Sequence, residues 1–240
     1  MSTLLITGAS RGIGRETALK LASDSSFKKI VVNCRENEAA LLGTVSLMRE
    51  ITEALIIPSV GDVGDMGYVR RLRESCGPVD VLINNAGISR TGLFTETDPA
   101  VWDEVIRTNL TSVFNTCRVF APDMVSNKWG RIINVSSVWG LVGASCEVAY
   151  SASKGGINAF TRALAKELAP SGVSVNAIAF GAVDTEMNAN LNEEEKRALA
   201  EEIPFCRMAS PREAAEAIAR LVSMPAYFTG EVVRFDGAWQ

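Results

Sequence analysis

The amino-acid sequence predicts an α/β fold: a doubly wound, parallel sheet of about seven strands with helices on both faces. Short apolar runs rich in Val and Ile alternate with longer segments of helical periodicity, an order typical of a parallel sheet. Several runs, such as 79–84, are nearly continuous in apolar residues, as expected of strands covered on both faces. The 240 residues contain no repeat and no Pro/Gly/Ser-rich linker, so we expect a single domain over residues 1–240.

Strands and helices are expected to alternate along nearly the whole chain. Strands are predicted at 4–7, 29–34, 54–59, 79–84, 131–136, 173–179 and 231–235. Helices are predicted near 13–23, 38–50, 65–76, 98–127, 149–168 and 211–223. The polar segment 184–205 interrupts this order and is expected to be either a mobile helical lid over the substrate or a solvated surface helix. Right-handed connections place the loops that follow the strands at one edge of the sheet, where ligands bind.

The composition excludes several classes of function. The net charge of −4 gives no basic excess for binding nucleic acid or an anionic membrane. No membrane-spanning segment or secretory signal is visible, so we expect a cytoplasmic protein. The five cysteines include no C-x-x-C pair, which fits a reduced compartment and not a disulfide framework or a zinc site. The chain has no histidine, so no His-ligated metal is expected, and any general acid or base must be Tyr, Lys, Cys, Asp or Glu.

A glycine-rich turn joins the first predicted strand to the first predicted helix. Gly8 permits the tight turn, Gly12 lets the backbone approach a pyrophosphate, and Gly14 allows close packing of helix on sheet. The helix N-terminus adds free N–H groups and the positive end of the helix dipole. The position of the turn therefore favours a dinucleotide site of the Rossmann type over an ordinary turn. The motif reads Thr7-Gly8-Ala9-Ser10-Arg11-Gly12-Ile13-Gly14.

The end of the second predicted strand indicates which dinucleotide binds. An acidic residue about 20 positions after the glycines would hold a ribose 2′-hydroxyl, whereas an arginine would suit a 2′-phosphate. Cys34 and Arg35 stand there, and Arg11 in the glycine-rich turn is placed to reach the same phosphate. Because arginine contacts phosphate bidentately, the sequence predicts NADP(H) in preference to NAD(H). The alternative is that Arg35 is only a solvated loop residue.

A tyrosine and a lysine one helical turn apart form a candidate acid–base pair. Tyr150 and Lys154 begin a predicted helix, and a spacing of four places them on one face. A cation about 4 Å from the phenol, at an effective dielectric of about 20, would lower the pKa of Tyr150 by about 3 units, close to neutrality. Ser137 ends a predicted strand, where its hydroxyl can hydrogen-bond a substrate oxygen.

Taken together, these residues resemble the classical short-chain dehydrogenase/reductase family over essentially the whole chain. The branch that the chain resembles most is that of the 3-oxoacyl-(acyl-carrier-protein) reductases, as its length, Asn176 and the segments 228–230 and 236–237 indicate. The resemblance implies an NADPH-dependent carbonyl reductase of fatty acid metabolism, acting on a 3-oxoacyl thioester linked to a carrier protein or CoA, and a homotetramer. The matching motifs are Thr7–Gly14, Asp62-Val63, Asn84-Asn85-Ala86-Gly87, Asn109, Ser137, Tyr150-x3-Lys154 and Thr185.

The resemblance also implies a role for each matched residue. Tyr150 exchanges a proton with the substrate oxygen, and Ser137 orients and polarises that oxygen. Lys154 lowers the pKa of Tyr150 and holds the nicotinamide ribose. Asn109 would hold a water that links Lys154 to solvent, although it can equally cap or bend its helix. Further cofactor contacts would come from Asp62 and Val63 at the adenine, from Asn85, Ala86 and Gly87 near the adenosine ribose, and from Gly181, Val183 and Thr185 around the nicotinamide.

Two residues near the expected substrate depart from the family pattern. Phe180 stands before Gly181 where the family has Pro, and is expected to pack on the nicotinamide or the substrate. Trp139 lies at a position of substrate contact and is expected either to narrow the pocket or to belong to the core. Two other functions stay open: reduction or oxidation of a steroid, sugar or small ketone, and catalytically silent sensing of a dinucleotide.

Overall fold

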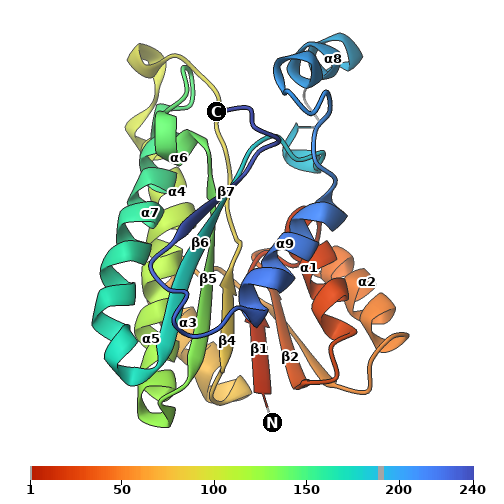
Figure 1. Ribbon diagram of the computed structural model, residues 1–240, viewed down its shortest axis with the longest axis vertical. Helices are drawn as coiled ribbons and strands as arrows, with labels where there is room; N and C mark the ends of the chain where they lie inside the picture. The colour runs from red at the N-terminus through yellow and green to blue at the C-terminus, as the bar shows by residue number, and fades with distance from the viewer. Residues whose placement is uncertain (1, 189–191) are drawn as a thin grey trace.

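The computed structural model describes residues 2–188 and 192–240 and has the predicted α/β architecture (Figure 1). Seven strands within these residues form one parallel sheet in the order β3-β2-β1-β4-β5-β6-β7. The direction of winding reverses between β1 and β4, and ligands of such sheets bind at the carboxyl ends of the strands beside that reversal. The strands are β1 (Ser2–Ile6), β2 (Phe27–Cys34), β3 (Leu55–Val60), β4 (Val81–Asn84), β5 (Gly130–Ser137), β6 (Val173–Phe180) and β7 (Val232–Phe235).

Helices cover both faces of the sheet. In Figure 1 helices α5 and α7 lie to one side of the strands, and α1, α2 and α9 lie to the other. Side chains of each strand alternate between the two resulting cores: Leu4 and Ile6 pack in the core beneath α1, α2 and α9, and Leu5 packs beneath α3, α5 and α7. The helices are α1 (Gly12–Ala22), α2 (Glu38–Arg49), α3 (Met66–Cys76), α4 (Pro99–Ile106), α5 (Ser112–Asn127), α6 (Trp139–Val142), α7 (Val148–Leu168), α8 (Glu193–Glu202) and α9 (Pro211–Ser223).

One helix differs from the sequence expectation, and the expected helical segment near the carboxyl edge is described in part. The single helix expected at 98–127 is divided into α4 and α5 by a π-helical turn at Arg107–Thr111. The segment 184–205 contains a short 3-10 turn, Glu186–Asn188, and helix α8, while its residues 189–191 lie outside the described residues. None of the ten residues of α8, all of them described, is buried. No helix in the described part of the chain is long and apolar enough to cross a membrane.

Candidate active site

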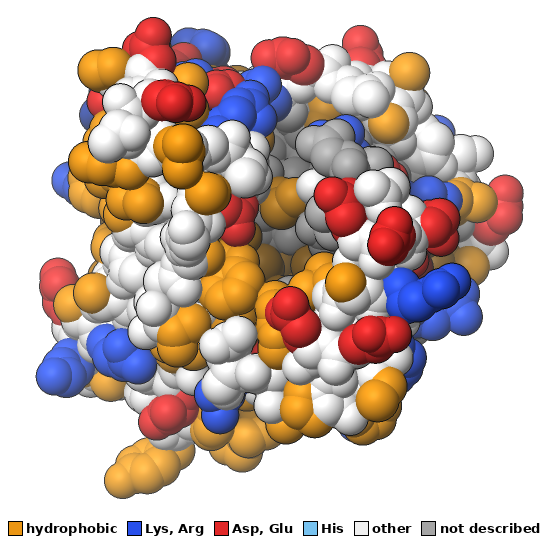
Figure 2. Space-filling view, turned by 90° about the horizontal axis from the view of Figure 1, so that it is seen from above, with side chains coloured by type: hydrophobic (Ala, Val, Ile, Leu, Met, Phe, Trp, Pro, Cys, Tyr) orange, Lys and Arg blue, Asp and Glu red, His pale blue; other side chains and the backbone are white. Residues whose placement is uncertain are grey.

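The carboxyl edge of the sheet is hollowed. Figure 2 shows the molecule from above this edge, with hydrophobic side chains inside a hollow near the centre of the view. Ser137, at the carboxyl end of β5, and Tyr150, in the first turn of α7, both come from elements that end or begin at this edge. The structure therefore brings together residues that the sequence separates by a whole loop.

Tyr150 and Lys154 lie one turn apart on α7, as predicted. Lys154 is only 3% exposed, and its Nζ donates a hydrogen bond to the Val135 carbonyl oxygen of β5 at 2.9 Å. The same Nζ lies 5.5 Å from the centre of the Tyr150 ring. Two neighbouring elements thus fix the ammonium group beside the phenol, with β5 supplying its hydrogen-bond acceptor.

The ionisation of this pair differs from the sequence expectation. Burial raises the pKa of Tyr150 to about 12; a hydrogen bond with Ser137 acts in the lowering direction, and the charge of Glu147 raises the pKa further. Burial likewise lowers the pKa of Lys154 to about 8. The expectation that Lys154 brings the pKa of Tyr150 near neutrality is therefore wrong for the protein chain, because desolvation of the phenol raises this pKa. Tyr150 is held in its protonated form, which is the form that can donate a proton.

Asn109 lies in the π-helical turn and is fully buried. Its Nδ2 donates to the Ile88 carbonyl oxygen at 2.9 Å and to Ser153 Oγ at 3.0 Å, while its Oδ1 accepts from the Ile88 N–H at 2.8 Å. A π-helical turn often marks a functional site. Here it directs one side chain to both the loop after β4 and the start of α7.

Gly87 lies between Asn109 and Lys154. A Cβ atom at Gly87 would lie 3.3 Å from Asn109 Oδ1 and 3.5 Å from Lys154 Nζ. The absence of a side chain at this described residue therefore lets the loop after β4 approach the buried lysine closely. The structure thus brings Asn109, Gly87 and Lys154 together at one place.

The glycine-rich turn has the shape that a pyrophosphate requires. Gly8 has a φ of +66°, and a Cβ atom at Gly14 would lie 2.1 Å from the Gly8 carbonyl oxygen, so neither position accepts a side chain. Arg11, the N-cap residue of α1, makes no side-chain capping bond, and the first turn of α1 contains no acidic residue. The N–H groups of this helix end are thus available to an anion, which fits a dinucleotide phosphate.

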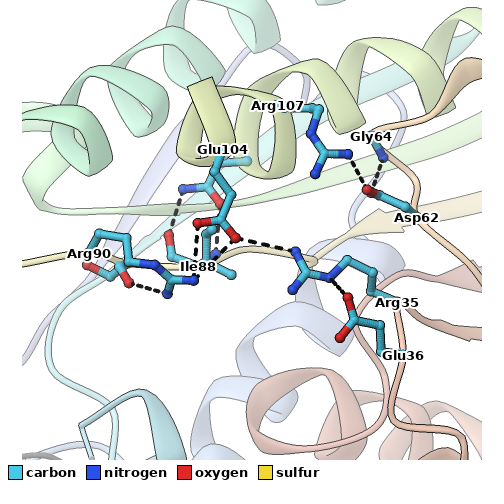
Figure 3. Close-up of polar contacts among 10 residues, drawn as sticks. Arg35, Glu36, Asp62, Gly64, Ile88, Arg90, Glu104 and Arg107 are labelled. Carbon is cyan, nitrogen blue, oxygen red and sulfur yellow. Dashed lines mark hydrogen bonds and ion pairs between the residues drawn. The ribbon is translucent and has the colours of Figure 1, made fainter. Parts of the chain in front are cut away.

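Arg35 directly follows β2 and already contacts carboxylates (Figure 3). Its Nε lies 2.9 Å from Glu36 Oε1, and its guanidinium lies 3.7 Å from Glu104 of α4. Glu104 also pairs with Arg90 at 3.2 Å. A 2′-phosphate at Arg35 would have to compete with Glu36 and Glu104. Arg11 is exposed at the start of α1 and makes no ion pair within the described chain.

Asp62 and Val63 lie at the same side, and both have partners within the protein. One oxygen of Asp62 accepts from the Gly64 N–H at 2.7 Å, and the other pairs with Arg107. Val63 is buried, and its carbonyl oxygen accepts from Asn115 Nδ2 at 3.1 Å. These bonds hold the loop after β3 against the π-helical turn and α5.

Asn85 and Ala86 bind the glycine-rich turn. Both backbone N–H groups donate to Thr7 Oγ1 at 3.0 Å, and Asn85 Nδ2 donates to the carbonyl oxygens of Thr7 and Gly8, each at 3.0 Å. These bonds cross from the end of β4 to the end of β1, the two strands at the reversal of the sheet. The Asn85 side chain is therefore engaged in holding the two loops together.

The substrate side requires one correction. Phe180 is only 3% exposed and packs edge-on against Phe235 of β7, with ring centres 5.6 Å apart. Its side chain belongs to the core beneath α1 and α9 and not to a substrate wall. Trp139 is half-buried, and its ring contacts Trp239 near the C-terminus, with centres 4.9 Å apart. Trp139 thus keeps part of its surface at the edge of the site.

Of the residues expected around the nicotinamide, Thr185 lies beside the glycine-rich turn, whereas Gly181 lies against Asp236. Val183 is buried and forms a β-bridge with Ala209. A Cβ atom at Gly12 would lie 3.5 Å from Thr185 Cγ2. A cavity of about 210 Å³ at this point is lined by Gly12, Arg15, Glu16, Asp184, Thr185, Glu186 and Pro211. Thr185 therefore faces the start of α1, while its contact with the nicotinamide stays a prediction.

Two contacts of the site have no counterpart in the sequence predictions. Ser153 accepts the Asn109 bond, and Glu147 accepts a hydrogen bond from the Ser89 hydroxyl of the loop after β4. The spacing from Glu147 to Tyr150 is three residues, which on a helix is a signal for proximity. Nothing local marks Ser153 or Ser89, since their partners lie 44 and 58 residues away in the sequence.

Comparisons with known proteins agree with this geometry. A family model described as short chain dehydrogenase matches residues 2–196. An uncharacterized oxidoreductase, YmfI of Bacillus subtilis, is 41% identical over 99% of this chain and 98% of its own length. The 3-oxoacyl-[acyl-carrier-protein] reductase FabG of Aquifex aeolicus is 37% identical over 97% of this chain and 95% of its own. The acetoacetyl-CoA reductase of Allochromatium vinosum is 39% identical over 97% of this chain and 96% of its own length.

Proposed function

The chain belongs to the short-chain dehydrogenase/reductase family and is an NAD(P)-dependent oxidoreductase, and we propose that it uses NADPH to reduce the ketone of a 3-oxoacyl thioester. The observation that carries the proposal is the position of Tyr150, which is hydrogen-bonded with Ser137 at the end of β5 and lies beside the buried Lys154. The relatives named as 3-oxoacyl-[acyl-carrier-protein] and acetoacetyl-CoA reductases support a thioester substrate.

In the proposed reaction the protein orients the ketone and supplies its proton. Ser137 donates a hydrogen bond to the ketone oxygen, and Tyr150 transfers its phenolic proton to that oxygen as the alcohol forms. When bound, the reduced nicotinamide supplies the hydride for the ketone carbon. Lys154, whose pKa is near 8, can then return a proton to Tyr150. Asn109 keeps the start of α7 in place through Ser153 and Ile88.

The cofactor is proposed to lie across the reversal of the sheet. The glycine-rich turn, with Gly8, Ser10, Gly12, Ile13 and Gly14, would hold the pyrophosphate at the N-terminus of α1. Arg11 and Arg35 would hold the 2′-phosphate that distinguishes NADPH. The remaining contacts are proposed at Asp62, Val63, Asn85, Ala86, Gly87, Tyr150, Lys154, Gly181, Val183 and Thr185.

We further propose one catalytic domain over the whole chain, with 184–205 as its substrate lid, and a cytoplasmic homotetramer. Trp139 is proposed as a substrate contact, because part of its ring surface stays at the edge of the site. Light scattering of the purified protein tests the tetramer, and a stable monomer would refute it.

Substitution of Arg35 tests the cofactor. In Arg35→Gln we expect kcat/KM for NADPH to fall by roughly 10- to 100-fold, because a charged hydrogen-bond donor to the 2′-phosphate is lost, while kcat/KM for NADH stays nearly constant. The matched control is Arg70→Gln, which removes one exposed arginine from α3. Equal losses with both cofactors, or a wild type that prefers NADH, would refute the NADPH preference.

A substrate series tests the thioester. We expect NADPH oxidation to be fastest, by kcat/KM, with the N-acetylcysteamine thioester of 3-oxobutanoate. A steroid ketone and a ketose serve as the competing substrates. Faster turnover of the steroid or the ketose would assign the protein to that substrate class instead of the thioesters. If none of the three is reduced, the catalytically silent alternative is favoured.

A further inference from the structure

Helix α7 is tied to the neighbouring strand β5 by a row of buried polar side chains. Lys154, Asn158 and Thr161 follow one another at spacings of four and three, which places them on one face of the helix. All three are buried. Their partners are consecutive residues of β5, namely Ser136 for Asn158 and the two residues before it for the others. The face that carries Lys154 is therefore held to the sheet by directed hydrogen bonds.

Asn158 joins three elements at the carboxyl edge of the sheet. Its Oδ1 accepts a hydrogen bond from the Ser136 hydroxyl of β5 at 2.7 Å, and its Nδ2 donates to the Gly140 carbonyl oxygen of α6 at 3.0 Å. The same Ser136 hydroxyl lies 3.3 Å from the Lys154 carbonyl oxygen. Both polar atoms of the Asn158 side chain are thus engaged, one by the strand that ends in Ser137 and one by the short helix α6.

Gly140 brings α6 into direct contact with the backbone of α7. A Cβ atom at Gly140 would lie 2.6 Å from the Lys154 carbonyl carbon and 2.8 Å from the Gly155 nitrogen, so no side chain fits there. A Cβ atom at Gly155 would lie 3.4 Å from the Gly140 carbonyl oxygen, the atom that accepts from Asn158. Lys154 therefore has α6 against its backbone and β5 at its ammonium group, and Asn158 is bonded to both elements.

The two residues proposed to act on the substrate oxygen stand beside these contacts. Ser137 directly follows Ser136, and Tyr150 lies one turn before Lys154 on α7. The proposed reaction needs the Ser137 hydroxyl and the Tyr150 phenol at the same oxygen atom, so a shift of α7 along β5 would separate them. Misplacement of reacting groups by about 1 Å can slow a reaction about a hundredfold. Hydrogen bonds resist such a shift because their geometry is directional.

We propose that Asn158 is a positioning residue for ketone reduction, which fixes the first turn of α7 against β5 and α6. It acts through Ser137 and Tyr150, whose relative placement it holds. The inference rests on the proposed reduction of a 3-oxoacyl thioester. Thr161 makes a comparable bond further from the carboxyl edge, where its Oγ1 accepts from Asn134 Nδ2 at 2.9 Å, and is expected to contribute to stability alone.

Asn158→Leu tests the positioning, and Thr161→Val is the matched control from the same helix face. Both remove a buried hydrogen-bonding group and keep its approximate volume, so both are expected to lower the midpoint of urea unfolding. With the N-acetylcysteamine thioester of 3-oxobutanoate, we expect Asn158→Leu to lower the single-turnover rate constant roughly 10- to 100-fold, while the dissociation constant of NADPH changes less than about threefold. Thr161→Val is expected to keep the wild-type rate constant. An unchanged rate constant in Asn158→Leu, or equal losses in the two variants, would overturn the proposal.

A second readout does not need turnover. Hydrogen exchange at the Val142 and Gly143 amides reports on α6, because both donate to backbone carbonyl oxygens one turn earlier. We expect this exchange to be about tenfold faster in Asn158→Leu and unchanged in Thr161→Val, since Asn158 bonds α6 whereas Thr161 bonds β5. Unchanged exchange in Asn158→Leu would overturn the positioning role even where the wild type reduces the thioester. A wild type that reduces no ketone, with faster exchange in Asn158→Leu, would instead overturn the proposed function and the role of Asn158 in reduction, while its bond to α6 stands.

Discussion

The catalytic wall and helix α8 border the same edge of the sheet but are held in opposite ways. The catalytic wall, defined as the proposed catalytic residues Asn109, Ser137, Tyr150 and Lys154, is buried or half-buried and joined to β5 and the loop after β4. Helix α8 has no buried residue, and its side-chain bonds are local, such as Lys196 with Glu193. The first arrangement fixes reacting groups against the sheet. The second leaves all side chains of α8 outside the core, as the proposed role of a substrate lid requires.

The difference is also energetic. Keeping Lys154 buried shifts its pKa down to about 8, and keeping Tyr150 there shifts its pKa up to about 12. Both shifts mean that the fold resists the charged form of each group. At pH 7 only Lys154 lowers the stability, because the phenol of Tyr150 is neutral in both the folded and the unfolded state. No such cost arises in α8, since its charged side chains face solvent.

Removal of the Tyr150 hydroxyl is expected to have the largest effect. Tyr150→Phe keeps the ring and its packing but eliminates the proton donor, so we expect kcat for ketone reduction to fall about a thousandfold. Single substitutions in α8 are expected to change kcat by less than about tenfold, because α8 contributes no group to proton transfer. Single-turnover NADPH oxidation measures both. Retention of a tenth of the wild-type rate in Tyr150→Phe, with an unchanged circular dichroism spectrum, would break the distinction between the wall and α8.

Replacement of Lys154 tests how much stability the protein loses by burying this charge. The pKa of Lys154 is depressed from 10.5 to about 8, so at pH 7 the folded state holds a buried charge that the unfolded chain carries in water. Lys154→Met removes this penalty but also the hydrogen bond to Val135. We therefore expect the free energy of unfolding at pH 7 to rise by about 2 kcal/mol, while reduction is lost. Urea unfolding provides the measurement, and a decrease at pH 7 would contradict it.

The pH dependence of stability tests the direction of the Lys154 pKa shift independently. Because the folded-state pKa of Lys154 lies below its unfolded value, wild-type stability is expected to increase as the pH rises from 8 towards 10. Lys154→Met is expected to lack this increase. Above pH 10 the raised pKa of Tyr150 has the opposite effect. The free energy of unfolding is expected to fall as the pH rises from about 10 to 12. Parallel curves for the two proteins between pH 8 and 10 would show that Lys154 is not the group responsible.

The sequence predicted the sheet well because the information is local. Each strand is an apolar run bounded by polar residues or glycine, and the structure moves the predicted ends by only one or two residues. The positions of Ser137, Tyr150 and Lys154 follow from the ends of these elements. The π-helical turn was not predicted, because helical periodicity does not distinguish it, and because the partners of Asn109 are distant in the sequence.

Two errors at the site have the same origin. The lowered pKa expected for Tyr150 counted the charge of Lys154 but not the desolvation of the phenol, which depends on the whole fold. The expected substrate contact of Phe180 ignored Phe235, which arrives from β7 and covers its ring. Both depend on groups that only the tertiary structure brings near.

Helices α8 and α9 begin with the same capping motif and so allow a matched test of the comparison. In α8 the motif is formed by Asn192 and Glu195, and in α9 by Ser210 and Glu213. Only α9 buries side chains, among them Ile218, in the core beneath α1. Loss of the N-cap side chain should therefore lower the global stability in α9 but not in α8.

Loss of the two caps is expected to have the smallest effects and the clearest contrast. Ser210→Ala should lower the free energy of unfolding by about 1 kcal/mol, since α9 unfolds with the core. Asn192→Ala should leave it within about 0.3 kcal/mol but accelerate hydrogen exchange at the Glu194 and Glu195 amides, which donate to Asn192. Equal losses of global stability would mean that α8 is coupled to the core as strongly as α9, and the division between a fixed wall and an adaptable helix would not hold.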